Sequence, residues 1–287
     1  MLIYVKHFAQ MCNRSWAIVP VFAYAMHRQH RLYVLFAKKD YVDCFPMLKN
    51  NHYIKFMFSH NSSSPLALEW RLALLPERTG LELKGDLRDI THLSGVAFVD
   101  GWQHSNDRSF IEEHRNEIVK LFQPDKIVTQ RVVSYFKNYH GLTIGVHVRR
   151  GDYKNYLGGK YCYTDDVYKN FIDKLRSYFS SEDIKSRFLI CSNENHKIPN
   201  DNNDIFSIED SDGITDLYAL SCCDYIIGPP SSYSKWASFY GGVPLFVILD
   251  KNSPIHIESF SKIVTFNQFE NGRRLCFNEQ VGEYFIS

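Results

Sequence analysis

The residues best suited to chemistry are two adjacent arginines that follow an apolar segment. Residues 144–152 read Ile-Gly-Val-His-Val-Arg-Arg-Gly-Asp. Side chains alternate between the two faces of a strand, so Val146 and Val148 would be buried on one face while His147 and Arg149 share the other. A guanidinium is a planar, permanently charged fork that matches two oxygens of a phosphate or carboxylate. The pattern therefore predicts an anion-binding site where a buried strand ends.

Gly151 permits a sharp turn after the arginines, and open α/β sheets place their binding crevice where strands run out into loops. One alternative for these residues is a surface turn held by an ion pair between an arginine and Asp152. Another is an Arg-Gly-Asp adhesion tripeptide, which requires an exposed loop in a secreted protein. The buried strand before the turn favours the ligand role, because such a strand has no structural need for His147 or Arg149.

Two further polar segments are expected at the same edge of the sheet. Ser192-Asn193-Glu194 follows an apolar strand. It is either an ordinary turn or a set of acceptors for the donors of a nucleobase. Ser231 and Ser232 lie between a strand and a helix, where free backbone N–H groups and the helix dipole favour an anion. One serine is expected to cap the helix, and the pair favours diphosphate binding.

Other common chemistries lack their motifs. The chain contains no Gly-x-Gly-x-x-Gly, Walker, His-Glu-x-x-His or Gly-x-Ser-x-Gly sequence. This argues against dehydrogenases, P-loop kinases, zinc proteases and serine hydrolases. Asp210-Ser211-Asp212 resembles the Asp-x-Asp that holds a divalent metal in many nucleotide-sugar enzymes. Asp212 is better explained as a helix cap, with Asp216 in the first turn of the helix, so we expect no metal site.

Length and composition indicate a globular chain with small-molecule partners. The 287 residues suffice for two domains, and a hydrophobic content of 45% excludes disorder. A net charge of +1 predicts no strong attraction to nucleic acid. Seven cysteines without a Cys-x-x-Cys pair are typical of free thiols in a reducing compartment. The start lacks a signal-peptide pattern, and the apolar stretch 18–26 is shorter than the roughly 20 residues that cross a bilayer. We expect a cytoplasmic protein without a transmembrane segment.

Apolar periodicity predicts strands that alternate with helices, which indicates largely parallel sheets covered on both faces. A boundary near Gln123 and Pro124 separates an N-terminal domain, 1–123, from a C-terminal domain, 124–287. The expected strands are 2–7, 32–37, 143–149, 187–191, 204–208, 225–228 and 245–249. The expected helices are 16–30, 108–122, 124–139, 165–179, 214–222 and 232–240.

The arginine segment resembles the signature of a known family. His147-Val148-Arg149-Arg150-Gly151-Asp152-Tyr153 is similar to the first motif of the α-1,2-fucosyltransferases of glycosyltransferase family 11, bacterial type. Residues 192–194 look like the second motif, and residues 216–227 with 231–236 look like the third. The resemblance spans residues 141–250. It implies a GT-B-like α/β fold of two facing Rossmann-type domains, GDP-fucose as donor, inversion at the anomeric carbon and no metal.

The resemblance also implies roles for individual residues. Arg149 would bind the β-phosphate and stabilise the departing GDP, helped by Arg150. Asp152 is a candidate general base, or it orients one of the arginines. Tyr153 and Tyr156 either stack on sugar faces or pack. The other implied donor-binding residues are His147, Asn193 and Glu194 for guanosine, Ser231, Ser232 and Tyr233 for the diphosphate, and Asn13 and Arg14 in the N-terminal domain.

The chain departs from the family pattern at two places. Residues 9–14 read Ala-Gln-Met-Cys-Asn-Arg where the family has a glycine-rich turn, so Asn13 and Arg14 are the surviving matches. In the third motif, Pro229 and Pro230 precede the serines, and Lys235 replaces a tryptophan. These changes bear most on acceptor specificity.

We therefore expect an inverting glycosyltransferase that moves fucose from GDP-fucose to a hydroxyl of an acceptor glycan, with an α-1,2 linkage to galactose. The C-terminal domain would bind the GDP-sugar, and the N-terminal domain would lie on the acceptor side. Expected partners are GDP-fucose and an oligosaccharide or lipid-linked glycan, which would bring the protein to a membrane surface. No cofactor is expected beyond the GDP-fucose substrate. The alternatives are a GT-B transferase that uses another GDP-sugar and a sugar-nucleotide-binding protein without turnover.

Overall fold

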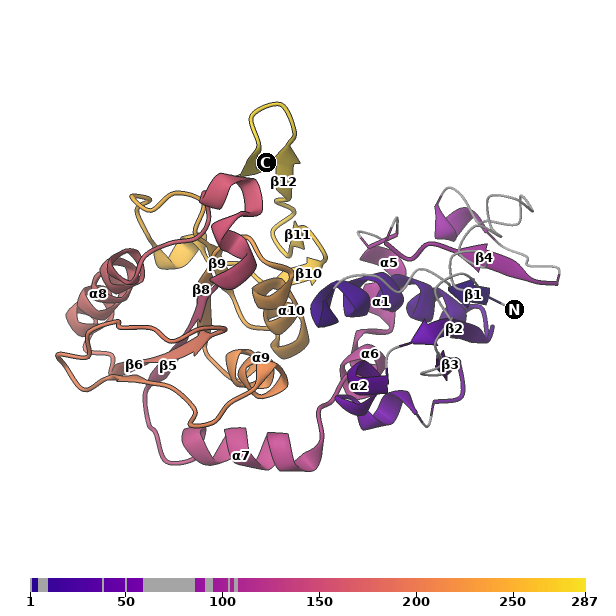
Figure 1. Cartoon of the computed structure of the whole chain (residues 1–287), viewed down its shortest axis with the longest axis horizontal. Helices are drawn as coiled ribbons and strands as arrows, with labels where there is room; N and C mark the ends of the chain where they lie inside the picture. The colour runs from indigo at the N-terminus through magenta and orange to yellow at the C-terminus, as the bar shows by residue number, and fades with distance from the viewer. Residues whose placement is uncertain are drawn as a thin grey trace. The chain divides into compact units, whose positions relative to one another are not determined.

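The computed structural model describes residues 2–4, 10–37, 39–49, 51–58, 86–90, 95–102, 104–105 and 108–287. The chain divides into two compact units, Met1–Asp125 (unit 1) and Lys126–Ser287 (unit 2). The boundary expected at residues 123 and 124 lies next to this division. Figure 1 shows helices and a sheet in each unit.

Unit 1 contains a parallel four-stranded sheet in the order β3-β2-β1-β4. Every side chain from Arg14 to Ala25 of helix α1 is buried, as expected for a helix that is apolar all round. The strands are β1 (Leu2–Tyr4), β2 (Leu32–Ala37), β3 (Ile54–Phe58) and β4 (Ala97–Val99). The helices are α1 (Met11–His27), α2 (Lys39–Asp43), α5 (Arg108–Glu113) and α6 (Arg115–Leu121), with short 3-10 turns at Pro46–Leu48 and Leu87–Asp89.

The predicted elements of unit 1 are present with corrected ends. The predicted strand 2–7 is described as far as Tyr4, and its remainder lies outside the described residues. The predicted helix 16–30 begins earlier and ends at His27, because Gln29 adopts the left-handed conformation with φ 54°. The predicted helix 108–122 is interrupted at His114, which separates α5 from α6.

Unit 2 is built on a parallel five-stranded sheet in the order β7-β6-β5-β8-β9, as the alternating pattern predicted. The strands are β5 (Leu142–Val148), β6 (Ser186–Ser192), β7 (Ile205–Phe206), β8 (Tyr225–Gly228) and β9 (Leu245–Val247). The helices are α7 (Lys126–Phe136), α8 (Asp165–Ser181), α9 (Gly213–Ser221) and α10 (Ser232–Gly241), with 3-10 turns at Gly151–Lys154, Tyr156–Gly159 and Ile257–Ser259.

The two faces of β5 have different environments, as its alternation predicted. Val146 and Val148 are fully buried in the apolar core that includes side chains of α8. On the other face, a Cβ at Gly145 would lie 2.6 Å from a methyl carbon of Leu220 on α9. Figure 1 shows α8 on one side of this sheet and α9 and α10 on the other. Helices therefore cover both faces, and His147 points toward the α9 and α10 side.

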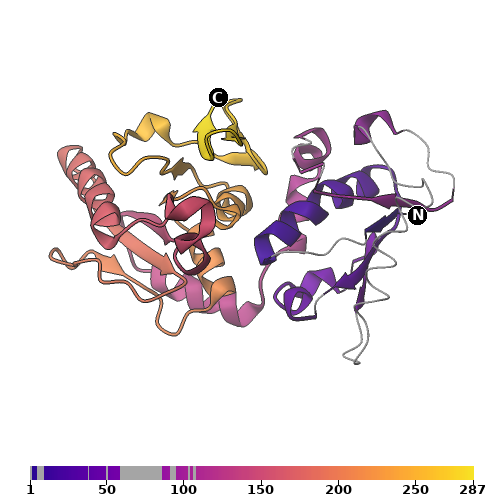
Figure 2. The same ribbon diagram turned by 45° about the horizontal axis from the view of Figure 1, so that its top comes forward.

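Unit 2 ends in two antiparallel ribbons that the periodicity did not predict (Figure 2). They are β10 (Ile263–Thr265) with β11 (Gln268–Phe269), and β12 (Leu275–Asn278) with β13 (Glu283–Ile286). The hydroxyls of Tyr284 and Tyr156 are 2.8 Å apart, and the backbone N–H of Tyr284 donates to the hydroxyl of Tyr161. The last ribbon is therefore fixed to the segment that follows the arginine motif.

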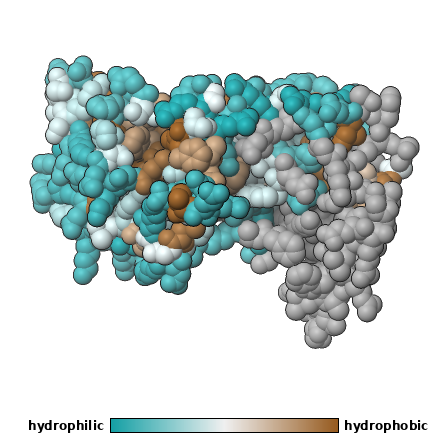
Figure 3. Space-filling view, turned by 90° about the horizontal axis from the view of Figure 1, so that it is seen from above, coloured by the Kyte–Doolittle hydropathy of each residue, from teal (hydrophilic) through white to brown (hydrophobic). Residues whose placement is uncertain are grey.

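Among the residues drawn in colour in Figure 3, hydrophilic ones predominate and apolar ones gather in patches. Among the helices in the described part of the chain, none combines the length and the apolar character needed to span a bilayer.

Candidate functional site

The site lies where the sheet of unit 2 reverses its strand order. The chain runs from β5 outward to β6 and β7, then returns to the other side of β5 for β8 and β9. In open α/β sheets, ligands bind outside the carboxyl ends of the strands at such a reversal. The carboxyl end of β5 leads into Arg149, that of β6 into Asn193, and that of β8 into the serine turn. The topology therefore brings the three predicted motifs to one edge.

A cavity of about 350 Å³ opens at this edge. It is large enough for a small ligand, since such pockets usually hold about 300–1,000 Å³. Four of the predicted residues line it, namely His147, Arg149, Asn193 and Tyr233. The other lining residues are Cys191, Ser192, Ser211, Asp212, Gly213 and Asp216.

Arg149 is held in place by its own loop. Its guanidinium Nη2 lies 2.8 Å from a carboxylate oxygen of Asp152, and its Cζ lies 5.5 Å from the centre of the Tyr153 ring. The backbone N–H of Arg149 donates to the hydroxyl of Tyr168 at 3.4 Å. The side chain is 15% exposed and lines the cavity. The ion pair considered as an alternative is thus present, and it orients the guanidinium beside the cavity.

Asn193 connects the end of β6 to the arginine turn. Its Oδ1 accepts a hydrogen bond of 2.8 Å from the backbone N–H of Arg150. Gly151 has φ 62°, and a Cβ there would lie 3.0 Å from Nδ2 of Asn193. Glycine is therefore required at this turn both for its conformation and for the space it leaves.

Three residues predicted to bind the donor substrate have side chains that contact other residues of the protein. Arg150 donates to Asp165 at the start of α8 with a separation of 2.6 Å. Glu194 lies 3.1 Å from the ammonium of Lys154. Arg150 and Glu194 are not among the residues that line the cavity. Arg14, in unit 1, is buried with its guanidinium 5.9 Å from the centre of the Tyr41 ring, one residue after Asn13 in the first turn of α1. Their donor roles stay predictions.

His147 is a neutral, buried imidazole. Its side chain is stacked on the ring of Tyr233, with centroids 4.9 Å apart. Burial lowers the pKa of His147 to about 3, and the charge of Arg149 lowers it further in the same direction. Its Nδ1 is buried and has no hydrogen-bond partner among the described residues. His147 therefore offers one ring nitrogen to a ligand and is not a proton acceptor at neutral pH.

Asp216 is a site residue that the sequence did not single out. It is buried at 8% exposure, it lines the cavity, and its Oδ1 has no hydrogen-bond partner among the described residues. Burial raises the pKa of its carboxyl to about 6, and the nearby charge of Asp212 adds to that rise. A buried, incompletely bonded carboxyl costs stability, and in a cavity it indicates a binding function. The local clue was an acid in the first turn of α9, which the helix dipole also explains.

The serine turn begins α10 as predicted. Ser231 is its N-cap, and its Oγ accepts a hydrogen bond of 3.2 Å from the backbone N–H of Tyr233. Tyr153 donates to the carbonyl of Pro230 at 2.5 Å, and burial raises the pKa of Tyr153 to about 12. Tyr153 therefore packs and fixes the turn. Ser232 is the first residue of α10 and is half-buried, and a helix N-terminus favours an anion.

Asp212 caps α9, accepting a hydrogen bond of 2.8 Å from the backbone N–H of Thr215. The prediction of a cap is confirmed. Within the described residues, the cluster of three or more metal-ligating side chains lies elsewhere and does not include Asp210 or Asp212.

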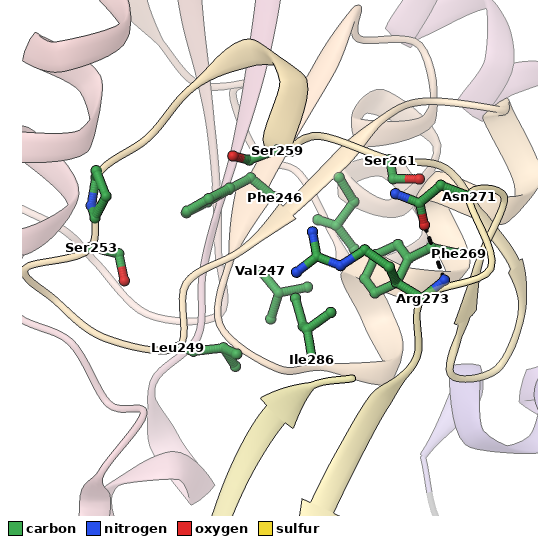
Figure 4. Close-up of a pocket in the computed structure, with 12 residues that line it drawn as sticks. Phe246, Val247, Leu249, Ser253, Ser259, Ser261, Phe269, Asn271, Arg273 and Ile286 are labelled. Carbon is green, nitrogen blue, oxygen red and sulfur yellow. Dashed lines mark hydrogen bonds between the residues drawn. The ribbon is translucent and has the colours of Figure 1, made fainter.

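A second cavity of about 330 Å³ lies along β9 and the C-terminal ribbons. Its walls mix apolar and polar side chains, and Arg273 extends toward its middle (Figure 4). It contains none of the residues predicted for the donor. The first cavity, with a cation, an imidazole, an amide and a carboxyl, has the convergent polar groups typical of a small-molecule site.

Comparisons with known proteins agree with this fold. The model of the family described as glycosyl transferase family 11 matches residues 96–262. Crystal structures of the fucosyltransferase NodZ from Bradyrhizobium are similar to the chain. One matches with a TM-score of 0.55 and 14% sequence identity, and the match covers 89% of this chain and 96% of the NodZ chain. Another, described as NodZ α-1,6-fucosyltransferase soaked with GDP-fucose, has a TM-score of 0.52 at 14% identity and covers 89% and 97%.

A mutant of Arabidopsis thaliana FUT1 in complex with GDP is also similar, with a TM-score of 0.54 at 15% identity over 92% of this chain and 74% of that one. These likenesses confirm the expected GT-B-like α/β fold. No curated protein sequence matches the chain.

Proposed function

Because the chain belongs to glycosyl transferase family 11, we propose that it transfers fucose from GDP-fucose to a hydroxyl of an acceptor glycan, forming an α-1,2 linkage to galactose with inversion at the anomeric carbon. The observation that carries the proposal is the cavity of unit 2, which gathers Arg149, His147 and Asp216 at the reversal of the sheet. In support, similar folds have been determined with GDP or GDP-fucose.

The buried end of the cavity has the groups that a guanine requires. Guanine presents N1–H and N2–H donors side by side, and a carboxylate accepts two such hydrogen bonds. Oδ1 of Asp216 is buried without a hydrogen-bond partner among the described residues, and so is the ring nitrogen Nδ1 of neutral His147. In our proposal Asp216 accepts the two guanine donors and His147 bonds the nucleoside, with Asn193 nearby.

The proposed chemical step depends on Arg149. The acceptor hydroxyl attacks C1 of fucose from the side opposite GDP, and the bond between C1 and the β-phosphate oxygen breaks. Negative charge grows on that phosphate, and the guanidinium of Arg149 with the N-terminus of α10 stabilises it. Such a preorganised donor is worth about 3–4 kcal/mol of barrier lowering. This stabilisation requires no metal at the diphosphate.

The proton of the acceptor hydroxyl needs a base. Asp152 is the candidate on the arginine turn, and 53% of its side chain is exposed. It also orients Arg149 through their ion pair, so both roles considered for this carboxylate are compatible with its position. We further propose that unit 1 binds the acceptor, that Asn13 and Arg14 contact the donor, and that the protein is cytoplasmic.

The decisive experiment is an assay of GDP-fucose turnover with a panel of galactosides, with and without EDTA. Release of GDP coupled to an α-1,2-linked product, unchanged by EDTA, is expected. Turnover with GDP-mannose in preference to GDP-fucose would favour a transferase for another GDP-sugar. Binding of GDP without turnover on any acceptor would indicate a non-catalytic binding protein. Activity that disappears in EDTA would contradict the metal-free mechanism.

A further inference from the structure

A cluster of three metal-ligating side chains lies in unit 1. His27 is in the last turn of α1, Glu113 ends α5, and His114 lies between α5 and α6. The Nδ1 atom of His27 is 3.0 Å from Oε1 of Glu113, and Nε2 of His114 is 3.7 Å from the same oxygen. One ligand atom from each residue lies within 4.8 Å of the other two. We call these residues the His–Glu–His cluster.

One imidazole of this cluster has a nitrogen without a hydrogen-bond partner among the described residues. Glu113 is bonded to His27, which accounts for one of the two imidazoles. The Nε2 atom of His114 is buried and has no hydrogen-bond partner among the described residues, although it faces the same carboxylate oxygen. Buried polar atoms in proteins are nearly always bonded, so an atom of this kind is a candidate to bind a water molecule or an ion. A cation between the three groups would supply the missing partner.

We propose that the His–Glu–His cluster binds one Zn²⁺ ion. Zinc is bound by imidazole nitrogen at about 2.0–2.1 Å and by carboxylate oxygen at about 2.0–2.2 Å, usually in tetrahedral geometry. Two ligand atoms of such a site are then about 3.4 Å apart. The two separations from Oε1 of Glu113, 3.0 and 3.7 Å, bracket that distance. Calcium and magnesium prefer oxygen ligands throughout, so two imidazoles select a transition metal.

The surroundings hold the ligands and set the charge. The ring of His27 packs on Phe110 with centroids 4.7 Å apart, which limits its rotation. The cluster adjoins the carbonyl end of α1, where the helix dipole favours a cation. Arg28 and Arg115 are the neighbouring residues in sequence, and burial lowers the pKa of Arg115. Their positive charge opposes the metal, so ionised Glu113 is essential to binding.

The metal would connect α1 to the junction of α5 and α6. None of the residues that line the nucleotide cavity belongs to the cluster, since the cavity is built from unit 2. The site is therefore independent of the proposed transfer. Zinc should raise the thermal stability of the protein, because a ligand that binds the folded state stabilises it.

The test uses full-length protein stripped with EDTA and titrated with ZnCl₂ by calorimetry, with Co²⁺ as a spectroscopic probe of the ligand geometry. One zinc per chain, tetrahedral Co²⁺ absorption and a rise in melting temperature are expected. His114→Asn and Glu113→Gln should both lose the binding heat and the stabilisation. Glu112→Gln is the matched control, because Glu112 is adjacent and bonds Arg108 instead.

Absence of zinc binding by the wild-type protein would overturn the proposal. So would equal binding by wild type and His114→Asn, because the ion would then be held elsewhere, for instance by the free thiols. Circular dichroism establishes that each variant is folded. If Glu113→Gln does not fold, His114→Asn and His27→Asn decide the question.

Discussion

Gly228 at the end of β8 lies directly against His147 at the end of β5. A Cβ at Gly228 would be 2.9 Å from Cβ of His147 and 3.1 Å from its carbonyl oxygen. These contacts are closer than carbon atoms normally approach, and one of them is to backbone that cannot move aside. The absence of a side chain at Gly228 therefore fixes how closely the two strands meet at the reversal of the sheet, and with it the position of the His147 ring on Tyr233.

Gly228→Ala should destabilise the protein and weaken GDP binding together. Overpacking of this kind costs about 1–3 kcal/mol. Gly213→Ala is the matched control for stability, because a Cβ at Gly213 meets nothing within 4 Å and Gly213 begins α9 without a positive φ. Urea unfolding of both variants measures the difference. Equal stability of the two variants would show that β8 can move away from His147 without loss.

Arg149→Lys should lower kcat/KM on the order of a hundredfold or more, because a point charge cannot reproduce the planar fork on a phosphate. Arg149→Ala should remove most transfer while the fold stays intact. Arg131→Lys is a control, since Arg131 bonds the carbonyl of Glu209 and lies outside the cavity. Steady-state rates with GDP-fucose and circular dichroism separate chemistry from folding. Unchanged turnover in Arg149→Lys would refute its proposed role.

Asp216→Asn should stabilise the fold while it impairs donor binding. Burial raises the pKa of Asp216 to about 6, so the protonated carboxyl favours the folded state. This stabilisation is present at low pH and is lost as the pH rises through about 6. Above it the buried charge costs up to about 3 kcal/mol, at 1.36 kcal/mol for each pKa unit. Asparagine carries no charge and places donors opposite the donors of guanine. Near pH 8 the variant should resist urea better than wild type and bind GDP more weakly.

The gain in stability should shrink to about half near pH 5 and vanish below the ordinary carboxyl pKa of 3.8, where Asp216 is protonated in the folded and the unfolded wild-type protein alike. If Asp216→Asn resisted urea less well than wild type near pH 8, interactions within the protein would offset the cost of burying the carboxylate charge.

Donor affinity should fall as the pH drops below about 6, because only ionised Asp216 accepts both guanine donors. The dissociation constant of GDP-fucose should rise about tenfold for each pH unit below that pKa. GDP-fucose is preferred to GDP, whose terminal phosphate loses its own proton near the same pH. His147, with a pKa lowered to about 3, does not titrate in this range. Asp216→Asn should show a flat profile, and a profile unchanged from wild type would contradict the role of Asp216.

Most of the fold of unit 2 could be predicted because its signals are local. The bounds of β8 agree with the sequence, and β5 differs by one residue at each end, since both strands are apolar runs that end at polar turns. The four antiparallel strands after Ile263 were missed. They are two to four residues long, too short for alternation to be recognised, and they depend on contacts such as that between Tyr284 and Tyr156.

The position of a side chain could be predicted where a single motif determines it, but not where it depends on another element. Arg149 and His147 line the cavity as their motif predicted, because one buried strand carries both. Arg150, adjacent in sequence, turns instead to Asp165 on α8, which no pattern in the motif indicates. Asp216 was recognised as an acid in the first turn of α9 and at the start of the third motif, but its burial in the cavity could not be predicted. That burial arises from Cys191 and the end of β6, which the sheet brings to it.

Lys235, which stands in place of a tryptophan of the family motif, should destabilise the protein at neutral pH. It is 4% exposed on α10, its Nζ donates to Oδ1 of Asn267 at 2.7 Å, and it lies 3.6 Å from the centre of the Phe266 ring. Burial lowers its pKa to about 7. The folded protein therefore loses stability as the pH falls from about 10 toward 7, because the unfolded chain takes up the proton first.

Lys235→Met should consequently raise the free energy of unfolding near pH 7. We expect about 2 kcal/mol, because the contacts of the ammonium group with the Phe266 ring and with Asn267 offset part of the cost of burying its charge. The difference should shrink near pH 10, where the folded wild-type protein holds a neutral amine. Urea unfolding at the two pH values measures both effects. A wild-type protein that is the more stable of the two near pH 7 would show that the contacts to Asn267 and Phe266 outweigh the burial of the ammonium group.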